Sequence, residues 1–362
     1  MHDDPLTQSP ASIELAGISR QVGSHFTLEG ISLRIAPGEI LGLIGHTGAG
    51  KSSLLRIIAG LDEPGSGQVL LGGCRATGTL PHKRGVAMVF QRDVFYPGQP
   101  LQRDRQEAAR AGVFDRWKNA GIPAEEVFQE LEFTENLFSQ RPETLSGGQG
   151  RRASLLRAMF RDTPILLADE PLAGLDLWTR DRVARLLWRF ARATGKSIVV
   201  VAHEPVEAIG LADRLAVLER GRLVQTGPPS QLLAEPAHRV VVSLLQYPPW
   251  NDVTRYAVRT PAEADGHGTV LVAPGHCGVQ ATCSPEVPAI AVRSLRNRWS
   301  SAGPFAEWIA TETGEVFRTP MKVDSPDQGW FVWDTESAFR FDAEGFRKGA
   351  SISNGRTTVT SS

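Results

Sequence analysis

The sequence lacks long hydrophobic runs, a charge excess of either sign and a cysteine pattern typical of metal or disulfide sites. Its apolar segments, such as Ser197–Ala202 and Val240–Leu245, are far too short to span a bilayer. With 39 basic and 40 acidic residues, the chain has no general attraction for nucleic acid or acidic membranes. The three cysteines, Cys74, Cys277 and Cys283, are an odd number and indicate free thiols in a reducing compartment.

The first residues also lack the basic and apolar regions of a secretion signal. We therefore expect a soluble cytoplasmic protein, and any membrane role must come through partners. The 362 residues are enough for two or three domains, each with its own core.

A glycine-rich segment between a strand and a helix is the most informative pattern in the chain. The run Ile40–Ile44 predicts a strand buried on both faces, and Leu54–Ile58 begins a pattern with helical period. Between them lies G-x-x-x-x-G-K-S, the phosphate-loop pattern, so we predict that the chain binds a nucleoside triphosphate. The residues of this nucleotide-binding loop are Gly45, His46, Thr47, Gly48, Ala49, Gly50, Lys51 and Ser52, with Ser53 next.

The residue types of this loop suit the chemistry of phosphate binding. Glycines let several backbone N–H groups approach one anion, and the positive end of the following helix adds to the attraction. We expect Lys51 to contact the β- and γ-phosphates and the Ser52 hydroxyl to ligate Mg²⁺. The alternative, an ordinary glycine-rich turn, is disfavoured by the flanking strand and helix.

A second apolar strand, Ile165–Ala168, ends in two adjacent carboxylates. We expect Asp169 to contact the magnesium ion, directly or through water, and Glu170 to polarise the water that attacks the γ-phosphate. A single carboxylate at a strand end is common and needs no function. The pair is more specific here because Leu172–Asp176 follows it.

A second helix with glycines at its start precedes this strand. We expect Ser146 to cap the helix, and Gly147, Gly148 and Gln149 come next. A capped helix with a glycine turn would explain the segment without any ligand. Its position just ahead of the carboxylate pair instead favours an anion-facing helix start.

Together these motifs resemble the ATP-binding subunit of ABC transporters. In that resemblance, Gly45–Ser52 is the Walker A loop and Asp169-Glu170 ends the Walker B strand. Leu145–Gln149 is then the signature sequence and Leu172–Asp176 the D-loop, which places Asp176 near nucleotide. The match extends from about Ile13 to Leu245.

Two further residues receive roles only through the resemblance. Gln91 stands at the Q-loop, which implies a catalytic and metal-contacting role, and His203 stands at the switch histidine, which implies a catalytic one. A lone histidine after an apolar strand is otherwise more often structural. One difference from the family is Val22, which occupies the place of an aromatic residue that usually stacks on adenine.

The resemblance implies an α/β P-loop ATPase domain over residues 1–245, with a helical subdomain at about 97–160. Residues 250–347 contain short alternating segments and five of the eight tryptophans, which favours an all-β, OB-like barrel of the type named TOBE. The remaining residues, 348–362, are rich in Gly, Ser and Thr and are predicted to be disordered.

The subgroup most similar to this chain contains the ATPases of bacterial sugar and glycerol-3-phosphate importers, which implies a peripheral protein on the cytoplasmic face of the inner membrane. The implied partners are a second ATPase subunit, identical or paralogous, membrane permeases and a solute-binding protein. Importers of polyamine, sulfate, molybdate or ferric iron have a similar layout. A soluble ABC ATPase acting on nucleic acid would be a protein of a different class, and so would a regulator whose working part is the C-terminal barrel.

Overall fold

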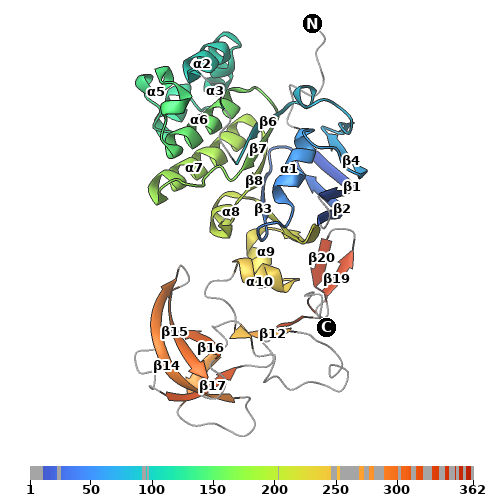
Figure 1. Cartoon of the computed structure of the whole chain (residues 1–362), viewed down its shortest axis with the longest axis vertical. Helices are drawn as coiled ribbons and strands as arrows, with labels where there is room; N and C mark the ends of the chain where they lie inside the picture. The colour runs from blue at the N-terminus through green and yellow to red at the C-terminus, as the bar shows by residue number, and fades with distance from the viewer. Residues whose placement is uncertain are drawn as a thin grey trace. The chain divides into compact units, whose positions relative to one another are not determined.

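The computed structural model describes residues 11–22, 26–91, 95, 98–202 and 204–245, and mainly strands from residue 251 onward. The chain divides into two compact units, residues 1–229 and 230–362 (Figure 1). The motifs named above all lie in the first unit.

A mostly parallel sheet forms the centre of the first unit. Its strands are β3 (Ile40–Ile44), β6 (Val86–Val89), β7 (Ile165–Asp169), β8 (Ser197–Val201), β9 (Arg214–Glu219) and β10 (Arg222–Gly227). They lie in the order β10-β9-β3-β8-β7-β6, and only the β9–β10 pair is antiparallel. The buried strands predicted at Ile165–Ala168 and Ile198–Ala202 are confirmed apart from their ends.

Both faces of this sheet are covered, which explains why its strands are apolar at every position. Along β7, Leu167 packs with the α1 helix (Lys51–Ala59) in one core cluster. Its neighbour Leu166 belongs to the second cluster, with residues of α6 (Gly147–Phe160) and α7 (Leu177–Thr194). Successive strand residues point to opposite faces, so an alternating polar pattern could not form here.

An antiparallel sheet packs on the α1 side of the first unit. Its strands are β1 (Ile13–Val22), β2 (Phe26–Ile35), β4 (Ser66–Leu71) and the short β5 (Cys74–Arg75), in the order β2-β1-β4-β5. Their inward residues join the same core cluster as α1. The two strands predicted at Ile13–Val22 and Phe26–Ile35 are confirmed.

The segment between β6 and β7 is helical, as predicted, and gathers on one side of the sheet (Figure 1). After the turn η1 (Pro81–Lys83) and β6 come α2 (Leu101–Arg110), α3 (Val113–Asn119), α4 (Ala124–Glu130), α5 (Glu135–Ser139), the turn η2 (Pro142–Thr144) and α6. Aromatic rings hold these helices together. Trp117 reaches beyond them and packs edge-on against Phe190 of α7 at 5.3 Å, which joins this helical segment to the sheet.

The α7 helix begins slightly before the predicted start at Thr179, and the short α8 helix (Pro205–Leu211) follows β8.

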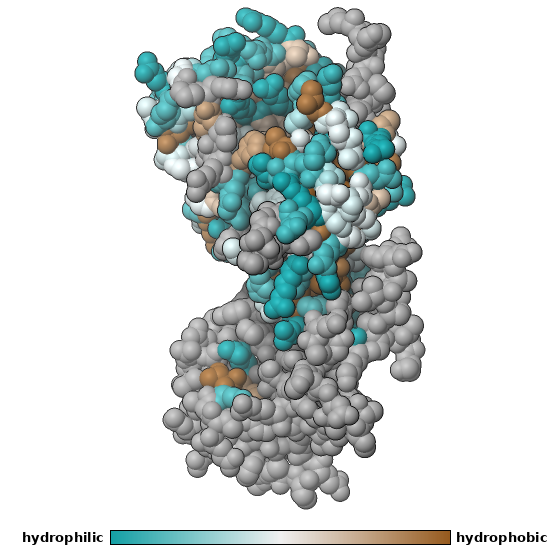
Figure 2. All heavy atoms as spheres, turned by 45° about the vertical axis from the view of Figure 1, so that its right-hand side comes forward, coloured by the Kyte–Doolittle hydropathy of each residue, from teal (hydrophilic) through white to brown (hydrophobic). Residues whose placement is uncertain are grey.

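No helix among the described residues combines the length and the apolar character needed to cross a membrane. Figure 2 shows that the forward face of the first unit is mainly hydrophilic, with hydrophobic atoms in small groups.

The second unit begins with two short helices and continues as strands. Its elements are α9 (Pro229–Ala234, which starts at the boundary), α10 (Arg239–Leu245), β11 (Asn251–Asp252), β12 (Thr269–Val272), β13 (Cys277–Gln280), β14 (Ala289–Ser300), β15 (Gly303–Ala310), β16 (Val316–Pro320), β17 (Gln328–Trp333), β18 (Phe339–Phe341), β19 (Ala350–Ser353) and β20 (Arg356–Val359). The described strands pair antiparallel in the orders β11-β12-β18 and β13-β17-β14-β15-β16. An OB-like barrel and a boundary near residue 245 stay predictions.

Among the last residues, the described strands β19 and β20 pair antiparallel, and the disordered tail over residues 348–362 stays a prediction. Two sequence features favour this pairing. Ile352 and Val359 are β-branched, and Asn354-Gly355 between the strands is a dipeptide that favours tight hairpin turns.

Candidate active site

The predicted site residues meet at the carboxyl ends of the parallel strands. Gly45 follows β3, Gln91 follows β6 and Glu170 follows β7. Parallel strands end at the same edge of a sheet, so their following loops share one crevice. The β8 strand lies between β3 and β7, and the Glu170 N–H donates to the Val201 carbonyl at its end, at 3.0 Å.

The phosphate loop joins β3 to α1 through a backbone that requires glycine. Gly45 has φ 153°, and a Cβ built there would lie 2.3 Å from the Leu218 carbonyl oxygen. Gly50 has φ 104° and begins α1 without any side-chain cap hydrogen bond. The first N–H groups of α1 are therefore not occupied by a capping side chain, as an anion site at a helix start requires.

The Lys51 ammonium lies within this loop. Its Nζ donates to the carbonyls of Gly45 at 2.7 Å and His46 at 3.1 Å. Burial lowers the pKa of Lys51, while the nearby charges of Glu170 and Asp169 act in the opposite direction. A cation is thus placed beside two carboxylates and a loop that opens to solvent.

Asp169 and Ser52 form an oxygen-rich pair at the start of α1. Asp169 is only 4% exposed, and burial raises the pKa of its carboxyl group. The Ser52 hydroxyl hydrogen-bonds to this carboxylate, yet Oδ1 of Asp169 has no hydrogen-bond partner. A buried acceptor without a donor, next to a hydroxyl, fits a hard cation such as Mg²⁺, which prefers oxygen ligands.

Glu170 and Gln91 contact each other across the crevice. The Gln91 Nε2 donates to Oε2 of Glu170 at 3.3 Å. Glu170 has φ 52°, a left-handed backbone that is rare outside glycine and is often found at functional sites. Two side chains that follow strands far apart in the sequence therefore meet at this edge of the sheet.

The sequence did not identify the residue that connects this pair to α6. Arg151 lies in the first turns of α6 and donates to the Phe90 carbonyl at 2.7 Å and to the Gln91 carbonyl at 2.5 Å. Its only sequence signal was its place directly after the glycines. Because of these two hydrogen bonds, a shift of α6 would also move the Gln91 backbone.

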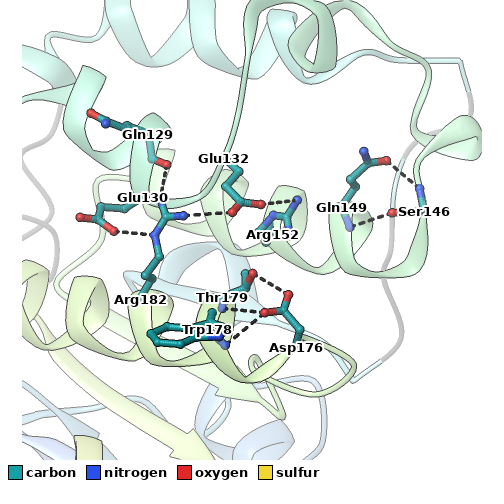
Figure 3. Close-up of polar contacts among 10 residues, drawn as sticks. All are labelled: Gln129, Glu130, Glu132, Ser146, Gln149, Arg152, Asp176, Trp178, Thr179 and Arg182. Atoms are coloured by element: carbon teal, nitrogen blue, oxygen red, sulfur yellow. Dashed lines mark hydrogen bonds and ion pairs between the residues drawn. The ribbon is translucent and has the colours of Figure 1, made fainter.

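The α6 helix start has a capping box. The Gln149 N–H donates to the Ser146 hydroxyl at 3.4 Å, and the Ser146 N–H donates to Oε1 of Gln149 at 2.9 Å (Figure 3). The predicted capping role of Ser146 is confirmed. Gly147 and Gly148 form the first turn, and both lie near the surface.

The α7 helix start lies against the start of α6. A Cβ built on Gly148 would be 3.8 Å from the Leu175 side chain. Asp176 caps α7, accepting from the N–H groups of Trp178 at 3.1 Å and Thr179 at 3.0 Å and from the Thr179 hydroxyl at 2.7 Å (Figure 3). These hydrogen bonds, with the Thr179 side chain foremost, lower the pKa of Asp176.

Two sequence predictions fall on residues that the structure leaves undescribed. His203 and the side chain of Val22 lie outside the described residues. Beside His203, Glu204 accepts from Arg180 of α7 at 2.9 Å, and Glu207 lies 3.0 Å from the same guanidinium. The structure thus brings Gly45–Ser52, Asp169, Glu170 and Gln91 together, whereas Ser146–Gln149 and Asp176 lie at two other helix starts.

A protein-family model and curated proteins match the sequence of this chain. A family model described as ABC transporter matches residues 28–173, which include the phosphate loop and the carboxylate pair. The sn-glycerol-3-phosphate import ATP-binding protein UgpC of Chromohalobacter salexigens is 36% identical over 301 residues, covering 77% of this chain and 79% of that protein. The lactose transport ATP-binding protein LacK of Rhizobium radiobacter is 34% identical over 264 residues, covering 73% and 71%.

Solved structures share the fold of the first unit. The dimeric structure of MJ0796, a bacterial ABC transporter cassette, has a TM-score of 0.52 and 27% identity, and covers 60% of this chain and 98% of that one. A post-hydrolysis state of the same cassette bound to ADP and Pi has a TM-score of 0.51 and 25% identity over the same shares.

Proposed function

This chain belongs to the ATP-binding proteins of ABC transporters, and from that premise we propose that it hydrolyses ATP at an interface between two such subunits to power solute import. The observation that carries the proposal is the convergence at the sheet edge. Lys51, Asp169 and Glu170 lie within electrostatic reach of one another, and Gln91 touches Glu170. A phosphate loop, a buried carboxylate and a second carboxylate aimed at the crevice are the parts that phosphoryl transfer to water requires.

In this proposal, the loop Gly45–Ser52 binds the phosphates through its backbone N–H groups, and Lys51 neutralises charge on the β- and γ-phosphates. Ser52 and Asp169 would hold Mg²⁺, which would shield the phosphate charge when bound. Glu170 accepts the proton of the attacking water, and Gln91 orients that water from the opposite side. Two further roles rest on the family resemblance. Ser53 would belong to the nucleotide-binding loop, and His203 would contact the γ-phosphate.

Replacing Glu170 tests the catalytic assignment. We expect Glu170→Gln to bind ATP as the wild type does and to lose turnover by a factor of roughly 100 to 10,000, the usual contribution of a general base. Steady-state phosphate release and titration with a fluorescent ATP analogue measure the two properties. Glu107→Gln, which removes an exposed carboxylate on α2 paired with Arg103, is the matched control. A Glu170→Gln protein that keeps half of its hydrolysis would remove Glu170 from the role of base.

A dimer explains the surface next to Asp176. Leu177 and Trp178, directly after this cap, are 75% and 82% exposed, which is unusual for large apolar side chains. The solved relative MJ0796 is a dimer. In the dimer that we propose, Ser146–Gln149 of one subunit closes on the nucleotide held by Gly45–Ser52 of the other, and Asp176 lies at the same interface.

A groove beside Gln91 suits a segment of a membrane partner. Its volume is about 500 Å³, and β6 and α6 supply most of its lining, to which Phe90, Phe95 and Arg161 also belong. Because Arg151 connects α6 to the Gln91 backbone, a partner segment in the groove would contact the elements that hold the reacting water. This placement would transmit movement between the permease and the site.

Reversing a charge at this groove tests the docking. We expect Arg161→Glu to reduce recovery of the protein with its permease from detergent-solubilised membranes and to leave hydrolysis by the isolated protein unchanged. Arg110→Glu, an exposed arginine at the end of α2, is the matched control. Equal recovery of the two variants would contradict the docking site.

The transported solute is proposed from the relatives alone. Their names indicate import of sn-glycerol-3-phosphate, transport of lactose and import of maltose or maltodextrin. We therefore propose a carbohydrate or a glycerol-3-phosphate-like solute and a peripheral position on the cytoplasmic face of a bacterial membrane. A solute-binding protein would complete the system. For the second unit, the antiparallel pairing of its described strands supports a regulatory OB-like barrel.

A further inference from the structure

The starts of α6 and α7 are joined by a cluster of charged side chains that no motif predicts. Glu132 lies between two arginines: its Oε1 is 3.0 Å from Nη1 of Arg182, and its Oε2 is 3.4 Å from Nη2 of Arg152 (Figure 3). We refer to Arg152, Glu132 and Arg182 as the Glu132 hub. Arg152 belongs to α6 and Arg182 to α7, so one carboxylate bridges the two helices.

The two arginines occupy equivalent places on their helices. Arg152 lies in the second turn after the Ser146 cap, and Arg182 lies in the second turn after the Asp176 cap. The capped starts themselves touch, since Gly148 lies against Leu175. The hub therefore holds the two helices one turn behind the residues that would meet the nucleotide.

Each arginine depends on the hub to a different degree. The Arg152 side chain is only 11% exposed, and its Nε has no hydrogen-bond partner. Its one ion-pair partner among the described residues is Glu132. Arg182 has further acceptors, with Glu130 at 3.2 Å and the Gln129 carbonyl at 2.7 Å. Loss of the Glu132 charge would leave the nearly buried Arg152 uncompensated, and α6 would be affected more than α7.

Glu132 has a backbone conformation that is unfavourable for a glutamate. Glu132 follows α4 with φ 51°, a left-handed conformation that glycine adopts without strain and glutamate does not. Leu131 and Phe133 on either side are buried, so the conformation is fixed by the core. The glutamate occupies this strained position while its carboxylate joins two helices from different parts of the unit.

We propose that Glu132 is a positioning residue that sets the angle between α6 and α7, so that Ser146–Gln149 and Asp176 reach a shared nucleotide together. This inference rests on the proposed function, because it concerns closure of the two-subunit interface. The ion pairs described for the hub join residues 130, 132, 152 and 182 and do not involve Gly45–Ser52, so we expect nucleotide binding to one subunit to be independent of it. Its contribution is confined to the step in which two subunits close.

The test measures closure and binding separately in the full chain. Glu132→Gln is placed in the Glu170→Gln background, and the ATP-dependent dimer is followed by sedimentation at several protein concentrations with Mg²⁺ and ATP. We expect its apparent dissociation constant to rise about tenfold, within the range of coupling between sites. Affinity for a fluorescent ATP analogue should stay within about twofold, because the phosphate loop is untouched.

Two further variants separate positioning from general stability. Arg189→Gln removes another ion pair between α7 and α4, with Glu126 at 2.6 Å, but this pair does not reach α6. It should leave dimer formation unchanged. Glu132→Gly relieves the left-handed backbone, so its thermal midpoint should not fall more than that of Glu132→Gln, while its dimer should be weakened equally.

Two results would overturn the inference. One is equal dimer formation by Glu132→Gln and Arg189→Gln, and the other is normal dimer formation by Glu132→Gly. A wild-type chain that binds no ATP would instead overturn the proposed function, and this inference with it.

Discussion

Two aspartates at two helix starts behave in opposite ways. Asp169 faces the start of α1, where no side chain caps the helix, and burial raises the pKa of its carboxyl group. Asp176 caps α7, and its hydrogen bonds to Thr179 and the Trp178 N–H lower its pKa. The fold therefore stabilises the charge of Asp176 and destabilises that of Asp169.

The difference separates a carboxylate whose hydrogen bonds are complete within the chain from a buried carboxylate whose hydrogen bonds are not. Asp176 finds its partners within its own chain, so its charge adds to stability without any ligand. Asp169 keeps one oxygen without a donor, and Lys51 beside it has a pKa lowered by burial. Charged groups held against solvation are common at binding sites, where a ligand supplies the missing interactions.

Removal of the Lys51 charge tests this contrast with the largest expected effect. We expect Lys51→Met to weaken ATP binding roughly 10- to 100-fold, since a charge-assisted hydrogen bond contributes about 1.5–3 kcal/mol. The nucleotide-free protein should be no less stable, because the lost ammonium was partly desolvated. Titration calorimetry and thermal unfolding measure the two effects. Lys118→Met, at an exposed site on α3, is the control, and a Lys51→Met protein that binds ATP normally would contradict the phosphate-loop assignment.

The start of α6 allows a sharper comparison, because its cap can be kept while its charge is changed. Aspartate caps helices as well as serine does, so Ser146→Asp should leave the thermal midpoint unchanged. Its carboxylate would face the γ-phosphate of the partner's nucleotide and should weaken the ATP-dependent dimer at least ~10-fold. Ser146→Ala should do the reverse, lowering the free energy of unfolding by about 1 kcal/mol with a smaller effect on the dimer.

Sedimentation of both Ser146 variants in the Glu170→Gln background distinguishes the two roles of this residue. If Ser146→Asp forms the dimer as readily as the wild type, the α6 start does not face a phosphate, and Ser146 is a cap only.

The sequence predicted the site around the phosphate loop because each part of this site needs an unusual local composition. The phosphate loop needs glycines and a lysine in fixed order, and Asp169-Glu170 needs a strand apolar at every position. The cap at Ser146 was also visible, because a capping box is local. In all these cases the residues that interact are close together in the chain.

The contacts between distant segments were not visible in the sequence. Arg84 is an example: it is buried, and its guanidinium donates to the carbonyls of Ile57 at 2.9 Å and Ile58 at 3.1 Å at the end of α1. The Glu132 hub is another: Glu132 lies in a segment that the sequence indicated only as a polar, mainly helical insertion, and its arginine partners belong to the later helices α6 and α7. An arginine or glutamate gives no local sign of a partner that only the fold brings near.

The two aspartates lead to the final, smallest prediction. Asp169 has a raised folded-state pKa, so the folded protein binds its proton more tightly than the unfolded chain does, and stability falls as pH rises through the window between the two pKa values. Asp169→Asn should therefore raise the free energy of unfolding at neutral pH, with the gain lost on acidification through that window as the wild-type carboxyl becomes protonated.

Asp176 should respond with the opposite sign. Its folded-state pKa is lowered, so its contribution is present above the unfolded pKa and is lost as pH falls through the folded pKa. Asp176→Asn keeps the cap and loses only the charge, so its thermal midpoint should fall slightly at low salt and neutral pH, and the difference should vanish in acid. Thermal unfolding of both variants across pH, without nucleotide, measures the pair. If Asp169→Asn and Asp176→Asn change the stability with the same sign, the two aspartates at the starts of α1 and α7 do not differ as their hydrogen bonds imply.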